Sequence, residues 1–143
     1  MIPSPIRVVI AEDDALVSEM VQRQLERLGY AIVGEAYDGH TAIAVVAETR
    51  PDVVILDIEM PGLNGLEVAE ELHASCPTPI VILTAYETPE LVNQATAAGA
   101  GAYLLKPPQP RDLDRAITIA MARFADIMQL RAMNAALQRL NAD

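Results

Sequence analysis

The 143-residue chain lacks several features that define whole classes of proteins. Its one cysteine, Cys76, cannot form an internal disulfide, which is typical of a reducing compartment, and we interpret it as a packing residue. Hydrophobic residues make up 52% of the chain, yet no apolar run approaches the ~18 residues that span a membrane. The first five residues have neither the basic region nor the apolar core of a secretion signal. These absences predict a cytoplasmic protein with no membrane association.

Basic and aromatic side chains are also scarce. Twenty acidic and 10 basic side chains give a formal net charge of −10, which repels nucleic-acid phosphates. Aromatic residues make up only 3%, too few for a base-stacking surface. We therefore expect no direct nucleic-acid binding by this chain. The acidity is confined to residues 1–107, with 16 acids and 5 bases, whereas residues 108–143 hold 4 acids and 5 bases.

Five short apolar runs alternate with segments of helical spacing. The runs cover residues 6–11, 31–35, 53–57, 80–84 and 102–105. Apart from Arg7 and the closing Asp57 and Thr84, the first, third and fourth are apolar throughout and rich in Val and Ile, as expected of parallel strands covered on both faces. The sequence therefore predicts an α/β fold, a doubly wound five-stranded parallel sheet in the flavodoxin-like order 2-1-3-4-5.

The helical segments are bounded by residues that cap or interrupt helices. In the first segment, the apolar positions Leu16, Met20 and Leu28 have helical spacing. The boundary residues are Gly29 after the first segment, Pro51 after the second, Asn64 and Glu67 opening the third, Thr88, Pro89 and Gly99 around the fourth, and Pro110 opening the fifth.

Polar residues follow four of the five predicted strands. They are Glu12, Asp13, Asp14, Asp57, Thr84 and Lys106. The carboxyl ends of parallel strands meet at one edge of the sheet, where such folds bind ligands. Crowded carboxylates favour a hard divalent cation such as magnesium, while a lysine and a threonine suit a bound phosphoryl group. Each residue alone has an ordinary explanation, and for Asp14 we prefer helix capping; the conjunction points to phosphoryl transfer.

Four stretches of the sequence resemble the signature blocks of bacterial response-regulator receiver domains, the phosphorylation switches of two-component systems. They are Val9–Asp14, Val54–Gly62, Ile82–Ala85 and Tyr103–Pro107. The resemblance extends from residue 6 to about 120. It implies a phosphorelay protein whose partner is a sensor histidine kinase or a phosphotransfer protein, because the chain has no phosphoacceptor histidine motif of its own.

The resemblance also assigns roles to individual residues. Asp57 is implied as the phosphoacceptor that forms an acyl phosphate, aided by Thr84 and Lys106. A Mg²⁺ cofactor is implied at Glu12, Asp13, Asp57 and the backbone carbonyl of Glu59. Thr84 and Tyr103 are implied as the switch pair, and the Lys106–Pro107 bond is expected to be cis. Such a domain catalyses only its own phosphorylation and dephosphorylation, so we do not expect an enzyme.

Two positions depart from the family pattern, and a third, Glu59, is implied to affect the lifetime of the phosphoryl group. Glu12 stands where aspartate is most common, which keeps the charge on a longer arm. Pro108 stands where an aromatic residue is usual, and the neighbouring prolines predict a stiff loop. The side chain of Glu59 is implied to influence the rate at which water removes the phosphoryl group.

The segment after Pro110 is longer than one face of a small sheet requires. At ~1.5 Å per residue it would reach about 45 Å as one helix. A first apolar stripe is Leu113, Ile117, Ala120, Phe124 and Ile127, and a second, shifted by one position, is Leu130, Met133, Leu137 and Leu140. We predict that the first packs on the sheet and the second leaves it as a coiled-coil or linker helix, giving a receiver unit of 1–122 and an extension of 123–143. An amphipathic helix folding back on its own domain is the alternative.

The stretch Ala116–Phe124 resembles the helical linker of ANTAR-type antitermination regulators. In that family an RNA-binding domain follows the linker. Here we expect either a protein without an output domain or a fragment of a longer chain that would carry one, and we favour the fragment. The extension is also expected to pair with a copy of itself as a homodimer.

Three other functions compete with the phosphorylation switch. An aspartate-dependent phosphatase has a second aspartate two residues after its nucleophile, where this chain has Glu59 followed by Met60. A receiver-like interaction module without phosphotransfer is the main alternative, although every site residue is present. A flavin protein is disfavoured because the loop after the first strand is acidic. His40 and His73 fall in helices away from the strand ends and are expected at the surface.

Overall fold

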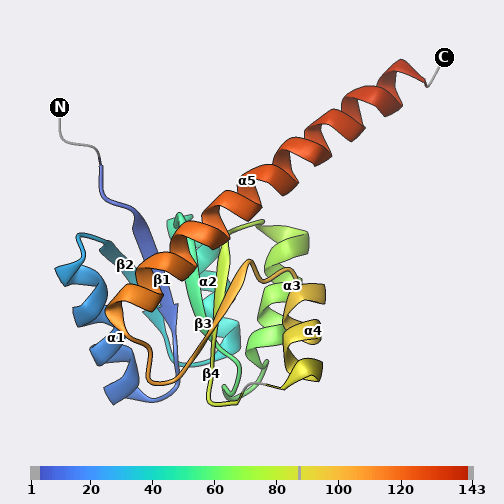
Figure 1. The fold of residues 1–143 in the computed structure, drawn as a ribbon. Coiled ribbons are helices and arrows are strands. Elements are labelled where there is room, and N and C mark those ends of the chain that lie inside the picture. Colours follow the sequence, from blue (N-terminus) through green and yellow to red (C-terminus); the bar gives the residue numbers. More distant parts are fainter. Residues whose placement is uncertain (1–3, 87, 142–143) are drawn as a thin grey trace.

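Five parallel strands alternate with five helices along the chain (Figure 1). The computed structural model describes residues 4–86 and 88–141; the first residues of the predicted receiver unit and the last two of the predicted extension lie outside this range. The elements are β1 (Arg7–Ala11), α1 (Ala15–Arg27), β2 (Ala31–Ala36), α2 (Gly39–Thr49), β3 (Val53–Asp57), α3 (Gly65–Ser75), β4 (Ile80–Thr84), α4 (Pro89–Ala97), β5 (Ala102–Leu105) and α5 (Pro110–Leu140).

The strands form one sheet in the order β2-β1-β3-β4-β5, as the sequence predicts. All four neighbouring pairs are parallel. β1 therefore lies between β2 and β3, and the chain winds outward from it in both directions. This reversal of direction beside β1 creates the crevice in which such sheets bind ligands.

Alternate residues along the strands face two separate cores. One core contains Val9, Val54 and Ile82 together with the inner faces of α2, α3 and α4. The other contains their immediate neighbours Val8 and Val53 together with the inner faces of α1 and α5. Because both faces are covered, β3 and β4 are buried over their whole length, which explains why each is apolar up to its last residue.

The helix starts follow the capping chemistry of the sequence. Asp14 caps α1, and its carboxylate accepts hydrogen bonds from the backbone N–H groups of Leu16 and Val17. Asn64 and Glu67 form the predicted capping box of α3. Thr88 caps α4 ahead of the first-turn proline. The preferred role of Asp14 as a cap is therefore confirmed.

The apolar positions that indicate α1 in the sequence are not the ones that the helix buries. Leu16 is 78% exposed and Leu28 is also exposed, whereas Val21 and Leu25 are fully buried. The helix exists as predicted, but Leu16 lies in its first turn and Leu28 is its C-cap, so neither reaches the sheet. Periodicity alone could not distinguish these end positions from the core stripe.

The first half of α5 packs on the sheet and the second half leaves it (Figure 1). Leu113, Ala116, Ile117 and Ala120 are buried, and no described residue of α5 after them is. The helix continues without a break to Leu140, so in this structure the segment beyond the sheet does not fold back on the domain. Among the described residues, no helix is both long and apolar enough to cross a membrane.

Candidate functional site

The strand register aligns the polar residues predicted from the sequence. Ala11 pairs with Leu56, so the residues that follow, Glu12 and Asp57, lie in the same row at the carboxyl edge of the sheet. Thr84 pairs with Leu105, the residue before Lys106. The acids at the ends of β1 and β3, the hydroxyl at the end of β4 and the ammonium after β5 therefore meet at one edge of the sheet.

The loop after Asp57 is held in place by a close approach of backbone. A Cβ atom added at Gly65 would lie 2.2 Å from the carbonyl oxygen of Asp57, so only glycine fits there. The Gly65 N–H also donates to the carbonyl of Ile58 at 2.8 Å. The start of α3 is thus fixed against the end of β3, which restricts where the Asp57 side chain can lie.

Lys106 lies between the two buried carboxylates. Its Nζ is 2.6 Å from Oε1 of Glu12 and 3.0 Å from Oδ1 of Asp57. Glu12 is fully buried and Asp57 is 2% exposed, so these are charge-assisted contacts largely removed from water. The ammonium partly neutralises the two acids and fixes the side chains beside each other. The Lys106–Pro107 bond is cis, as expected.

The three acids Glu12, Asp13 and Asp57 form a cluster that could hold a cation. One carboxylate oxygen from each lies within 4.8 Å of the others. The second oxygen of Glu12, Oε2, is buried and has no hydrogen-bond partner among the described residues. A buried oxygen without a partner is costly, and a bound cation would satisfy it. An all-oxygen donor set of this kind fits Mg²⁺.

The pKa values of the cluster are shifted in opposite directions. Burial, followed by the hydrogen bond with Asp57, raises the pKa of Glu12 to about 8. Burial also raises the pKa of Asp13, again with Asp57 as the next cause. Burial by itself would raise the pKa of Asp57, but hydrogen bonds from Glu12 and Lys106 outweigh it and lower that pKa. A proton shared by the cluster therefore resides on Glu12 and leaves Asp57 ionised.

The side chain of Thr84 is buried at the same edge but is bonded away from the acids. Its hydroxyl donates to the carbonyl of Tyr86 at 2.9 Å and accepts from the Tyr86 N–H at 3.1 Å. The hydroxyl is therefore held by the turn that leads to α4. Rotation of this side chain would break these two bonds, which ties the conformation of the turn to that of Thr84.

Tyr103 and Glu59 lie at the margin of the site. The Tyr103 ring is half exposed and borders a small apolar depression shared with Thr84, Tyr86 and Leu91. The Glu59 side chain is exposed and outside the acid cluster, although its backbone N–H donates to Oδ1 of Asp57 at 3.3 Å. Thus Glu59 contacts the Asp57 carboxylate through its backbone N–H.

Gln24 supports the site although the sequence analysis did not single it out. Its Nε2 donates to the carbonyl of Pro108 at 3.2 Å, which links α1 to the loop that carries Lys106. Pro108, unusual for a receiver at this position, is buried there. Because 84 residues separate Gln24 from Pro108, no local pattern could reveal the contact.

The fold and the acidic site at the carboxyl edge of the sheet are those of a known protein family. A family model described as the response regulator receiver domain matches residues 8–118. The chain therefore belongs to the response regulator receiver family, which acts in two-component signalling, and its long final helix fits the predicted ANTAR-like extension.

Two curated relatives are transcriptional regulators. The chain is 44% identical over 126 residues to the transcriptional regulatory protein PdtaR of Mycobacterium tuberculosis, which covers 88% of this chain and 62% of PdtaR. It is 41% identical over 117 residues to the uncharacterized transcriptional regulatory protein YxjL of Bacillus subtilis, which covers 80% of this chain and 54% of YxjL. The chain thus spans less than two thirds of either relative.

Solved structures show the same fold. The signal receiver domain of NarL from Mycobacterium tuberculosis matches with a TM-score of 0.79 at 34% identity, over 84% of this chain and 98% of that one. The chemotaxis protein CheY4 of Vibrio cholerae matches with a TM-score of 0.74 at 31% identity, over 80% of this chain and 97% of that one.

Proposed function

We propose that this receiver is a phosphorylation switch in which Asp57 accepts a phosphoryl group from a histidine kinase or a phosphotransfer protein. The observation that carries the proposal is the cluster at the carboxyl edge of the sheet. There the carboxylates of Glu12, Asp13 and Asp57 lie together, with the Lys106 ammonium 3.0 Å from Asp57. Family membership over residues 8–118 supports the same function.

The residues supply positioning and charge. An ionised Oδ of Asp57 attacks the phosphorus of the donor phosphohistidine, the new P–O bond forms, and the P–N bond breaks with its electron pair leaving on the imidazole nitrogen. Lys106 already contacts the nucleophilic carboxylate and would contact the phosphoryl oxygens next to it. Burial alone would raise the pKa of Asp57, but its hydrogen bonds with Glu12 and Lys106 lower it, which favours the anionic carboxylate for the attack.

Magnesium would be held by Glu12, Asp13, Asp57 and the backbone carbonyl of Glu59. When bound, it neutralises charge on the phosphoryl oxygens. The buried, unpartnered Oε2 of Glu12 supports this assignment, because the protein alone leaves that oxygen unsatisfied.

The switch would run from Thr84 to the α4–β5–α5 surface. For the Thr84 hydroxyl to reach a phosphoryl group on Asp57, it must release the Tyr86 backbone. The turn before α4 would then move, and Tyr103 on β5 would occupy the apolar depression beside it. Phosphorylation thereby biases an equilibrium between two arrangements of this surface.

The test is the intact mass of the protein after incubation with acetyl phosphate. We expect one added phosphoryl group in the presence of magnesium and none in its absence. Asp57→Asn should remain unmodified, whereas Asp126→Asn, a matched change on the exposed part of α5, should be modified like the wild type. Modification of Asp57→Asn would place the phosphoryl group on another residue and contradict the proposal. No modification of the wild type with acetyl phosphate or a kinase would favour the interaction module without phosphotransfer.

We further propose that the chain is not a turnover enzyme and that its output passes through α5, in a regulator of the kind its relatives represent. Steady, Asp57-dependent release of p-nitrophenol from p-nitrophenyl phosphate would contradict the first part. The cytoplasmic location and the absence of direct nucleic-acid binding stay predictions.

A further inference from the structure

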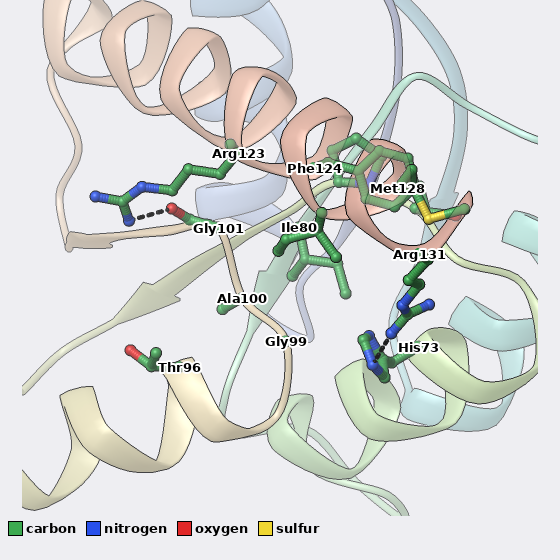
Figure 2. A pocket seen from close by; sticks show the side chains of 14 residues that line it. His73, Ile80, Thr96, Gly99, Ala100, Gly101, Arg123, Phe124, Met128 and Arg131 are labelled. Atoms are coloured by element: carbon green, nitrogen blue, oxygen red, sulfur yellow. Dashed lines mark hydrogen bonds between the residues drawn. The ribbon is translucent and has the colours of Figure 1, made fainter. Parts of the chain in front are cut away.

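A cavity of about 180 Å³ lies beneath α5 where the helix leaves the sheet (Figure 2). Its walls come from the end of α3, the start of β4, the loop between α4 and β5, and α5. Ile80 opens β4 at the end opposite Thr84, so the strand separates the cavity from the level of the phosphoacceptor site by roughly 13 Å. The cavity is therefore distinct from that site.

The cavity exists because a helix face passes over small residues. The face of α5 that buries Ala120 continues through Phe124, Ile127 and Arg131, beyond the point where the sheet can cover it. Opposite it, the loop Gly99–Gly101 contributes almost no side-chain volume. A Cβ atom at Gly101 would lie 2.8 Å from Cα of Ala120, so this loop must stay small to let the helix approach.

The charge of the lining is opposite to that of the whole molecule. Among the described residues that line the cavity are Arg123, Arg131 and His73, and none is Asp or Glu. This cationic rim belongs to a chain with a formal net charge of −10. Figure 2 shows Arg123 on one side of the cavity and Arg131 with His73 on the other, with Ile80 between them.

Both guanidinium groups are oriented by single contacts. Arg123 donates to the carbonyl of Gly101 at 2.8 Å, and Arg131 is hydrogen-bonded to Nε2 of His73. Each contact uses one of the five N–H groups of an arginine, so donors remain for an anion. On the α5 side, the cavity is lined by the Phe124 ring and the Met128 thioether, which pack well against a flat aromatic body.

We propose that this cavity is a binding site for a small organic acid, an aromatic carboxylate whose ring packs on Phe124 and Met128 while its carboxylate meets Arg123 or Arg131. The cavity, at about 180 Å³, is smaller than the pockets of about 300–1,000 Å³ that hold drug-sized ligands, and a protein helix would need more space still. The volume therefore fits a small molecule. Since five of the lining residues, Arg123, Phe124, Ile127, Met128 and Arg131, lie on the part of α5 that leaves the sheet, the ligand binds directly where the extension begins.

The experiment compares naphthalene-2-carboxylate with naphthalene-2-carboxamide, which has the same shape and no charge. Binding to the full chain is followed by amide chemical shifts. We expect shifts at Gly99, Gly101 and the α5 residues 124–131, and an affinity about tenfold higher for the carboxylate, the gain typical of one charge-assisted hydrogen bond.

Three variants make the comparison specific. Arg123→Gln combined with Arg131→Gln should abolish the preference for the carboxylate, while Arg139→Gln, further along the same helix and outside the cavity, should keep it. Asp57→Asn should bind both compounds like the wild type, which separates this site from the proposed phosphoacceptor function.

Four outcomes would overturn the proposal: no binding of the carboxylate at millimolar concentration, equal affinity for the two compounds, shifts confined to other surfaces, or an equal loss in Arg139→Gln. The paired arginine variant changes only exposed side chains, so a well-dispersed amide spectrum is expected and keeps the comparison valid.

Discussion

At the scale of single residues, Glu12 combines burial with incomplete pairing. Lys106 binds one of its oxygens, and the other oxygen is buried without a partner among the described residues. Asp57 adds a second buried carboxylate beside it. Such an arrangement costs stability in the metal-free protein and is the environment in which a cation binds with most effect.

Glu12 should make the metal-free protein less stable as the pH rises. Its pKa is about 8 in the folded protein against an ordinary value of 4.5. A raised pKa means that the folded state holds the proton longer, so the stability contribution is complete below pH 4.5 and is lost as the pH rises to about 8. One such group changes the free energy of unfolding by at most ~1.4 kcal/mol per pH unit. Urea unfolding between pH 5 and 8 should show this slope, and Glu12→Gln should reduce it.

The same substitution should act in the opposite direction on metal binding. Glu12→Gln removes a proposed Mg²⁺ ligand charge, so the rise in Tm on adding magnesium should shrink, although the metal-free variant is more stable at pH 8. Glu26→Gln, an exposed change on α1, is the control and should alter neither the slope nor the magnesium effect. An unchanged pH slope in Glu12→Gln would show that Glu12 does not hold the proton.

The polar residues of the site were predictable because they follow apolar strands directly. Glu12, Asp57, Thr84 and Lys106 each stand at or just after a strand end, and parallel strands bring their carboxyl ends together. Orientation was not predictable. The bonding of the Thr84 hydroxyl to Tyr86 depends on a turn conformation, which no residue pattern in the sequence specifies.

At the scale of elements, the turn between β4 and α4 is the proposed link between chemistry and surface. Thr84→Val should leave phosphorylation of Asp57 detectable but reduce its effect on the turn, because valine has the shape of threonine without the hydroxyl. Hydrogen exchange of residues 84–105 should change on phosphorylation in the wild type and much less in Thr84→Val. Thr84→Ser, which keeps the hydroxyl, should behave like the wild type. An equal response in Thr84→Val would remove this residue from the switch.

Replacing a large apolar side chain by alanine should have different effects on stability in the two halves of α5. Ile117 is fully buried against the sheet, so Ile117→Ala should lower the free energy of unfolding by about 2–5 kcal/mol. Leu137 lies on the same helix but is 55% exposed, so Leu137→Ala should change the free energy of unfolding of the monomer by less than ~0.5 kcal/mol. Urea unfolding at low protein concentration measures both. A large loss in Leu137→Ala would place the extension against the domain.

The existence of the elements was easier to predict than the faces they bury. Composition and end signals located every strand and helix, because Val- and Ile-rich runs and capping residues act locally. On α1, however, the core is formed by Val21 and Leu25, and the equally apolar Leu16 lies at the helix end, beyond the sheet. Burial there depends on where the helix crosses the sheet, which is tertiary information.

At the scale of the whole molecule, the exposed half of α5 carries an apolar stripe that the domain does not cover. Leu130, Met133, Leu137 and Leu140 are each more than half exposed and recur with spacings of three and four residues. Leucine at this density on a helix in water is unfavourable unless it is paired. The heptad-like spacing fits a second copy of the same helix, so self-association through α5 is our prediction.

Leu137→Asp tests this prediction because it places a charge in the middle of the stripe. The wild type should sediment as a concentration-dependent dimer, and the variant as a monomer at the same concentrations. Ala135→Asp puts the same charge on the opposite side of α5 and should leave the dimer intact, which excludes a general effect of added charge on an already acidic chain. Phosphorylation should shift the dimerisation constant if α5 carries the output, and Thr84→Val should abolish that shift. A wild type that stays monomeric at high concentration, before and after phosphorylation, would instead assign the stripe to a partner other than a second copy.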